Sequence, residues 1–222
     1  MREAAKRILV RGPSRKNHIA GQAVLFMLVR AKKERTMAVN KQAIDRTVKL
    51  GLLAAISILL VYLIHFPIFP AASYLEYDMA DVPILIGTFL FGPLWGLLLT
   101  AVVSVLQWVL VSPASGWVGA LMHFCATGGC ALLAGTLYHR HHSLKGAIIG
   151  MVAGGILQVL LMVPLNLIFT VHFNGAPREV VLAMLPTVII PFNAIKVAVN
   201  GLLTFLLYKR AGHALKLPIV KG

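Results

Sequence analysis

The sequence predicts an all-α integral membrane protein with six transmembrane helices. Its 222 residues are 59% hydrophobic and only 13% charged, whereas a soluble domain carries about 25% charged residues. Residues 82–139 and 147–177 contain no Asp, Glu, Lys or Arg. A helix that spans a bilayer needs roughly 20 apolar residues, and a soluble core helix keeps one polar face, so these stretches predict several membrane spans.

Proline, glycine and polar residues divide the apolar sequence into the expected spans. Pro67 ends the first span, and Gly92-Pro93 and the segment 112–116 are typical of turns. The second span is short for a bilayer. The expected spans are residues 49–66, 82–91, 94–111, 117–138, 146–171 and 180–208.

The charge distribution predicts the orientation of these spans. The net charge is +14, and 13 of the 21 Lys and Arg residues precede residue 50. With six spans, the basic N-terminal segment, the loop 139–145 and the basic tail lie on one side, and the acidic loop 68–81 lies on the other. Basic segments stay in the cytoplasm, so we expect both termini there. Because the basic residues follow this membrane pattern, the charge does not indicate a nucleic-acid partner.

Three regions follow from the same pattern. Residues 1–48 form a basic N-terminal extension, residues 49–210 the six-helix membrane domain, and residues 211–222 a cytoplasmic tail. The apolar segment 20–29 is too short to span, so it fits a helix on the membrane surface. A short basic leader follows Met37, which suggests a natural start there; peptides from before Met37 in the natively expressed protein would contradict this hypothesis.

Lys196 is the most informative residue, because it lies near the middle of the sixth span. A cation at that depth costs roughly 2.5–3.5 kcal/mol on insertion scales. Asn193, Lys196 and Asn200 share one helix face. Pro164 and Asn166 form a similar polar point in the fifth span, where the proline frees a backbone carbonyl.

Two interpretations of Lys196 stay open. Its ammonium group can line a binding cavity, which we favour, or it can pair with a carboxylate for structural reasons. No carboxylate lies within a span, so the candidates for pairing are in the loop: Glu76, Asp78 and Asp81.

Motifs for catalysis are missing from the sequence. It has no Gly-rich phosphate loop, no His-Glu-x-x-His, no Gly-x-Ser-x-Gly and no paired carboxylates within a span. We therefore expect no catalytic residues, no metal site and no bound cofactor. His123 is interpreted as a satisfied packing histidine, Gln107 and Gln158 as amides that bond across helices, and Cys125 and Cys130 as free thiols.

Five segments resemble the riboflavin-specific S components of energy-coupling factor (ECF) vitamin transporters. The Asp-x-x-Asp-x-Pro and Pro-Phe-Asn-x-x-Lys patterns are the most specific, and the resemblance covers about residues 49–210. The segments are residues 74–83, 87–93, 119–128, 190–196 and 203–209. The resemblance implies a six-helix subunit of a bacterial cell membrane, with both termini cytoplasmic, that captures riboflavin from outside. It also implies as partners a transmembrane coupling subunit and two cytosolic ATPases.

The resemblance further implies which residues bind. An outer-loop glutamate falls on Glu76, with Asp78 as a neighbouring candidate, and three further contacts fall on Asn166, Asn193 and Lys196. Expected apolar walls for the flavin ring are Leu75, Met122 and Phe192. The small residues expected to dock the coupling subunit are Gly51, Ala54 and Ala55.

Alternative functions remain at this point. A subunit of the same class can bind folate, thiamine or pantothenate instead. A small intramembrane enzyme using Lys196 and His123, or an assembly factor that uses only its small-residue faces, belongs to another class.

Overall fold

The computed structural model describes residues 15–72, 75–173 and 175–215. Expectations about residues 1–14 and 216–222 lie outside the described residues. The chain forms two compact units, which divide between Thr47 and Val48. Each unit is considered by itself.

The helix α2 (Arg15–Leu63) supplies the described part of the first unit and the first membrane helix of the second. In the first unit, the side chains from Phe26 to Val29 are exposed, and Arg30 forms an ion pair with Glu34 at 2.9 Å. The segment 20–29, for which a helix was expected, is helical and forms part of the continuous helix α2.

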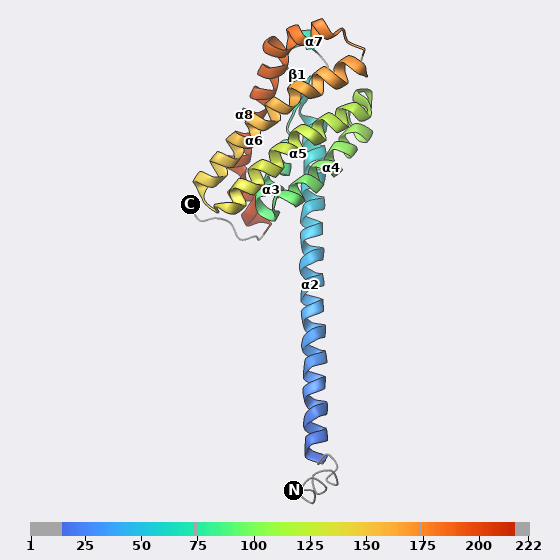
Figure 1. Ribbon diagram of the computed structural model, residues 1–222, viewed down its shortest axis with the longest axis vertical. Helices are drawn as coiled ribbons and strands as arrows, with labels where there is room; N and C mark the ends of the chain where they lie inside the picture. Colours follow the sequence, from blue (N-terminus) through green and yellow to red (C-terminus); the bar gives the residue numbers. More distant parts are fainter. Residues whose placement is uncertain (1–14, 73–74, 174, 216–222) are drawn as a thin grey trace, which may run out of the picture. The chain divides into compact units, whose positions relative to one another are not determined.

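The second unit is a bundle of helices with one small hairpin. Figure 1 shows α5 beside α6, and α3 among its neighbours α4, α5 and α8. Its elements after α2 are β1 (His65–Pro67), η1 (Pro70–Ala72), β2 (Glu76–Asp78), α3 (Asp81–Phe91), α4 (Pro93–Leu110), η2 (Pro113–Ser115), α5 (Gly116–Arg140), α6 (Leu144–Leu165), η3 (Asn166–Thr170), α7 (Arg178–Met184), η4 (Leu185–Ile189) and α8 (Ile190–Ala214).

Five helical segments of the described chain are long and apolar enough to cross a membrane, which confirms a multi-pass helical protein. They are Asn40–Leu63, Pro93–Leu110, Gly116–Arg140, Leu144–Thr170 and Arg178–Ala214.

The expected second span behaves differently from the other five. The helix α3 has 11 residues, which at about 1.5 Å per residue cover only about 16 Å. Its side chains from Asp81 to Phe89 are all buried. The helix is therefore enclosed by protein and ends at the turn through Gly92, whose φ of 109° suits glycine.

An antiparallel hairpin replaces part of the loop expected at 68–81. β1 pairs with β2 in the register His65 to Asp78, Phe66 to Tyr77 and Pro67 to Glu76. The all-α prediction missed these two strands, which have only three residues each. The hairpin leaves Glu76 exposed and buries Tyr77 and Asp78.

Glycines set the close approach of α5 and α6. A Cβ atom at Gly150 would lie 2.7 Å from the backbone oxygen of Ala134, and one at Gly154 would lie 2.7 Å from that of Cys130. Small residues let helices approach closely in membranes. Cys125 and Cys130 are free thiols, as expected.

The prolines of the last two spans do not interrupt them. The α-helix α6 continues past Pro164 into the π-helical turn η3, and Pro186 lies inside the π-helical turn η4 that leads into α8. Turns of this kind are rare and often occur at functional sites. Asn166 begins the first of them.

A buried polar cavity as the candidate binding site

A cavity of about 290 Å³ lies between β2, α4, α5, α6, η3 and α8. This volume is at the small end of the roughly 300–1,000 Å³ that small-molecule sites occupy. All residues that the sequence analysis assigned to substrate binding line it: Glu76, Asp78, Asn166, Asn193, Lys196, Leu75, Met122 and the further wall residue Phe192. The structure thus brings together side chains from four separate segments.

Lys196 lines this cavity and also pairs with a carboxylate. Its Nζ donates to Asp78 Oδ2 at 2.9 Å, and the two residues are 7% and 4% exposed. Lys196 therefore lines a cavity and has a carboxylate partner at the same time, because β2 brings a loop carboxylate to the face of α8. A buried cation is tolerated when a carboxylate and further hydrogen bonds surround it.

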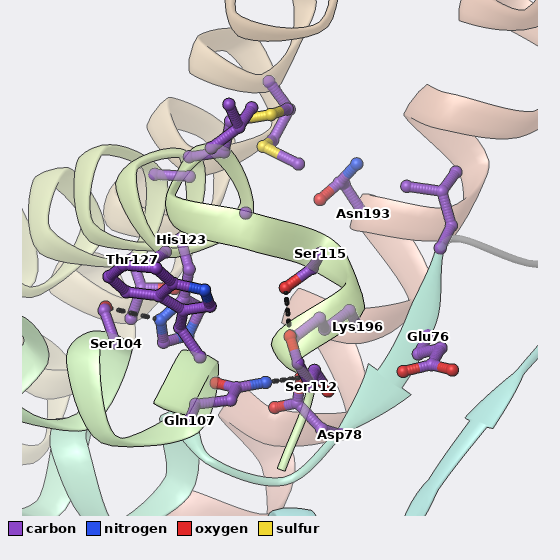
Figure 2. A pocket seen from close by; sticks show the side chains of 18 of the residues that line it. Glu76, Asp78, Ser104, Gln107, Ser112, Ser115, His123, Thr127, Asn193 and Lys196 are labelled. Atoms are coloured by element: carbon purple, nitrogen blue, oxygen red, sulfur yellow. Dashed lines mark hydrogen bonds and ion pairs between the residues drawn. The ribbon is translucent and has the colours of Figure 1, made fainter. Parts of the chain in front are cut away.

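Asp78 is held in place from several sides. The backbone N–H of Ala80 donates to its Oδ1 at 3.0 Å, and Asn200 Nδ2 donates to its backbone oxygen at 3.0 Å. Gln107 Nε2 contacts its Oδ2 at 3.4 Å. The contacts from Gln107 and Asn200 join β2 to α4 and α8, and Figure 2 shows Gln107 beside Asp78.

Tyr77 supports the same end of the cavity. Its hydroxyl group donates to Asn200 Oδ1 at 2.9 Å. Burial raises the pKa of the Tyr77 phenol above its ordinary value, so the hydroxyl group keeps its proton and can act as this donor.

A second buried carboxylate lies beside the first. Asp81 is 2% exposed and contacts His123 Nε2 at 3.1 Å. Thr127 Oγ1 donates to Asp81 Oδ1 at 3.0 Å, and Asn200 Nδ2 contacts Asp81 Oδ2 at 3.3 Å. The sequence analysis did not assign Asp81 to the site.

His123 has the hydrogen bonds expected of a satisfied packing histidine, and it also lies at the cavity. Its two ring nitrogens contact Asp81 and Ser104, the latter at 2.8 Å, and the residue also lines the cavity. Figure 2 shows Ser104, His123 and Thr127 grouped on one side of the cavity. A histidine in a long charge-free stretch was the available signal for this role.

Asn166 and Asn193 are fixed by their own helices. Asn166 Nδ2 donates to Met162 O and Asn193 Nδ2 donates to Ile189 O, both at 2.8 Å. Thr170 Oγ1 donates to Asn166 Oδ1 at 3.1 Å. Each amide thus has a set orientation beside the cavity before a ligand enters, which lowers the entropy cost of binding.

Two glutamines bond across helices, as expected. Gln158 Nε2 contacts Thr127 Oγ1 at 3.4 Å, and Gln107 contacts Asp78 as described above. Gln107 Oε1 is buried and has no hydrogen-bond partner within the described residues. A buried acceptor without a donor is costly, so this oxygen is suited to an N–H or O–H group of a ligand.

The cavity is distinguished by its chemistry and not by its size. A second cavity of about 490 Å³ lies between α6 and α8, and its walls are mainly apolar, for example Met151, Leu202 and Phe205. Ligand sites combine apolar walls with a few placed polar groups that set orientation. Only the smaller of these two cavities has such a convergent polar set.

The expected docking residues on α2 do not share one environment. Ala54 is 6% exposed and lies in the core, so its assignment to a docking surface is corrected. Gly51 and Ala55 are exposed, and a Cβ atom added at Gly51 would meet nothing within 4 Å. Ala54 lies on the same helix face as the buried Leu50 and beside the buried Leu53, so this face of α2 points into the core.

The fold and the cavity define a multi-pass helical membrane protein with a polar internal cavity. The family described as ECF transporter, substrate-specific component, matches residues 45–208. The chain belongs to this family.

Individual relatives agree with this assignment. The riboflavin transporter RibU of Staphylococcus aureus (strain TCH60) is 31% identical over 186 residues, covering 80% of this chain and 95% of the relative. The riboflavin transporter FmnP of Bacillus subtilis (strain 168) is 27% identical, covering 69% and 84%. A solved S component of a bacterial ECF transporter is similar with a TM-score of 0.66 and 31% identity, covering 77% of this chain and 97% of that one.

Proposed function

We propose that this chain is the riboflavin-binding subunit of an ECF-type importer that is driven by ATP hydrolysis in partner subunits. The observation that carries the proposal is the cavity where Lys196, Asn166 and Asn193 meet apolar walls. The relatives named as riboflavin transporters support the choice of ligand. The subunit itself is not an enzyme in this proposal.

The groups around the cavity suit the chemistry of riboflavin. Its flat ring carries carbonyl oxygens and one imide N–H, and its ribityl chain carries hydroxyl groups. Lys196 and Asn193 can donate to the carbonyl oxygens, and the buried Gln107 Oε1 can accept from the imide. Glu76 and Asp78 can accept from ribityl hydroxyls.

Apolar residues complete the proposed site. Leu75, Met122 and Phe192 line the cavity and provide the surface against which a flat ring can lie. Glu76 is exposed on β2 (Figure 2), where a ligand entering the cavity would meet it.

The proposed topology has six membrane segments in a bacterial cell membrane, with both termini cytoplasmic. In this arrangement the short helix α3 is the second segment, and the hairpin and Glu76 face the outside. The positive-inside rule supports it, because Arg140 and Lys145 lie between the fourth and fifth expected spans and Lys209 and Arg210 follow the sixth. With six spans, these positions are on the same side of the membrane as the basic N-terminal segment. A cysteine that replaces Gly175 should react with an impermeant thiol reagent added outside the cell. A cysteine that replaces Lys145 should react only when the reagent is given access to the inside. The reverse pattern would contradict the topology.

The proposed partners are a transmembrane coupling subunit and two cytosolic ATPases. The exposed face of α2 that contains Gly51 and Ala55 is the proposed contact with the coupling subunit, because small residues let a second helix approach closely. Reorientation of the whole subunit in the membrane would then release the ligand inside.

A fluorescence titration tests the ligand directly. The purified chain should quench riboflavin fluorescence with a saturable curve at micromolar concentrations or below. Folate, thiamine and pantothenate in excess should not reduce the quenching. Absence of riboflavin binding would refute the proposal, and competition by one of the other vitamins would replace riboflavin with that compound.

A further inference from the structure

We propose that the apolar cavity between α6 and α8 holds one acyl chain of an anionic phospholipid, with the phosphate group of that lipid beside Lys209. This cavity shares no lining residue with the polar cavity that is proposed to bind riboflavin. The lipid site therefore goes beyond the proposed function and does not need riboflavin.

The cavity begins where α6 and α8 move apart. Deeper in the span the two helices touch, because a Cβ atom at Gly155 of α6 would collide with Val197 of α8. A Cβ atom at Gly201 would lie 3.2 Å from Met151 Cγ. From these contacts the cavity follows α6 toward its N-terminus and α8 forward to Lys209. It is thus bounded at depth by helix packing and reaches the basic end of both spans.

The length of the cavity matches one leaflet of a bilayer. Its lining residues run from Ser143 to Val152 along α6 and from Leu202 to Lys209 along α8. At about 1.5 Å per residue, these segments cover about 14 Å and about 10 Å. Half of a hydrocarbon core that is about 30 Å thick measures about 15 Å. An acyl chain of a single leaflet fits this depth, whereas a transmembrane helix of a partner would need a groove along the whole span.

The walls of the cavity suit a hydrocarbon chain. Phe89 and Tyr138 are buried, with ring centroids 5.0 Å apart, and the hydroxyl groups of Tyr138 and Tyr208 hydrogen-bond to each other at 2.8 Å. Ile148 and Leu206 line the cavity and are exposed, so it opens to the surface that faces lipid. Water has few polar partners in such a space, and an apolar chain fills it better.

Positive charge at the end of the cavity selects the headgroup. Lys209 lines the cavity and is itself exposed, and Arg210 and Lys145 are exposed as well. Residues 82–178 and 180–222 contain no Asp or Glu, and none of these three bases takes part in an ion pair among the described residues. A basic pocket between transmembrane helices is suited to an anionic lipid headgroup.

The position of Lys209 allows both parts of the lipid to be bound at once. The stem of a lysine packs on apolar surface while its ammonium group reaches the interface. Tyrosine side chains such as those of Tyr138 and Tyr208 are typical of the same interfacial level. The chain in the cavity would therefore leave its phosphate group at the level of the Lys209 ammonium group.

Native mass spectrometry of the purified full chain tests the lipid site. The protein is titrated in mild detergent with dioleoyl phosphatidylglycerol, which is anionic, or with dioleoyl phosphatidylcholine, which has no net charge. The wild type should retain one phosphatidylglycerol at lower concentrations than phosphatidylcholine. Because the two lipids have the same chains, this difference measures recognition of the headgroup. Glycerol phosphate, which lacks the chains, should not bind at these concentrations.

Two variants separate the headgroup from the chain. Lys209→Gln should weaken phosphatidylglycerol binding about fivefold, the effect of one basic residue near a membrane surface, and should leave phosphatidylcholine unchanged. Arg178→Gln, at an exposed base outside both cavities, should bind like the wild type.

Leu206→Trp places a larger side chain in the cavity and should weaken binding of both lipids. Leu160→Trp is the matched control, because the two leucines are 58% and 61% exposed and Leu160 lies outside both cavities. If Leu206→Trp does not fold, Lys209→Gln decides the matter, since it changes an exposed side chain.

Equal retention of the two lipids by the wild type would overturn the inference, as would unchanged phosphatidylglycerol binding in Lys209→Gln. If Leu206→Trp keeps its lipid but no longer copurifies with a coupling subunit, the cavity is a protein contact and the inference is wrong. The titrations contain no riboflavin, so their result is separate from the test of the proposed function.

Discussion

Lys196 connects ligand chemistry with charge balance at the scale of single residues. Its position in an apolar span was enough to mark it as unusual, since a cation there must be paired or must serve a function. The sequence could not show that Asp78 would reach it. The two residues are 118 positions apart, and only the hairpin brings the carboxylate to α8.

Replacement of Lys196 gives the most direct prediction at this scale. Lys196→Ala should weaken riboflavin binding by about 1.5–3 kcal/mol, the usual value of a hydrogen bond to a charged group. Titration of flavin fluorescence measures the change. Lys145→Ala, which alters an exposed lysine outside the cavity, should have no effect; an unchanged affinity in Lys196→Ala would remove this residue from the site.

The remaining site residues differ in how far the sequence could identify them. The helical spacing places Asn193 on the same face as Lys196, so the sequence identifies it as a candidate site residue. Asn166 is also a candidate from the sequence, because it follows Pro164 in the fifth span. Asp81 and Ser104 gave no such signal, because a loop aspartate and a serine in an apolar helix are ordinary features. Their role depends on contacts between α3, α4 and α5 that no local pattern encodes.

Close packing of small residues acts at the scale of the helices. Gly150 and Gly154 are four residues apart, the spacing of a small-residue packing pair, and the structure places both where α6 approaches the α5 backbone. The boundaries of α3 were also near those expected, but its burial was not predictable from composition. An apolar helix that faces lipid and one that is enclosed by protein have the same kind of sequence.

A matched pair of glycine substitutions tests this packing. Gly150→Ala places a Cβ atom 2.7 Å from the backbone oxygen of Ala134, which cannot move as a flexible side chain can. We expect a loss of about 1–3 kcal/mol in stability, the usual cost of overpacking, seen as a lower melting temperature. Gly51→Ala meets nothing within 4 Å and should be neutral or slightly stabilising, since alanine favours a helix. Equal effects of the two substitutions would contradict this account of the contact.

The proposed docking face of α2 has its own test. Gly51→Trp adds a large side chain to an exposed position and should leave riboflavin binding intact while it reduces copurification of the coupling and ATPase subunits. Leu160→Trp on α6, at a side chain that is 61% exposed, is the matched control. Equal copurification of both variants would move the contact away from Gly51.

At the scale of the whole molecule, composition predicted the class and the resemblance predicted the family. Long apolar stretches identify spans because the bilayer imposes their length, and five of the six expected spans are long and apolar enough in the described structure. The hairpin was missed because its three-residue strands leave no periodic signal. Neither its register nor the cavity beside it follows from hydropathy, since both depend on how distant segments pack.

The absorption spectrum of the purified protein is the measurement that tests the central claim most directly. The chain, produced in cells supplied with riboflavin and purified in mild detergent, should carry the flavin absorption bands at about one flavin per chain. Lys196→Ala, purified in the same way, should carry less. A folded, monodisperse wild-type protein without flavin bands, which also takes up none when riboflavin is added, would contradict the account.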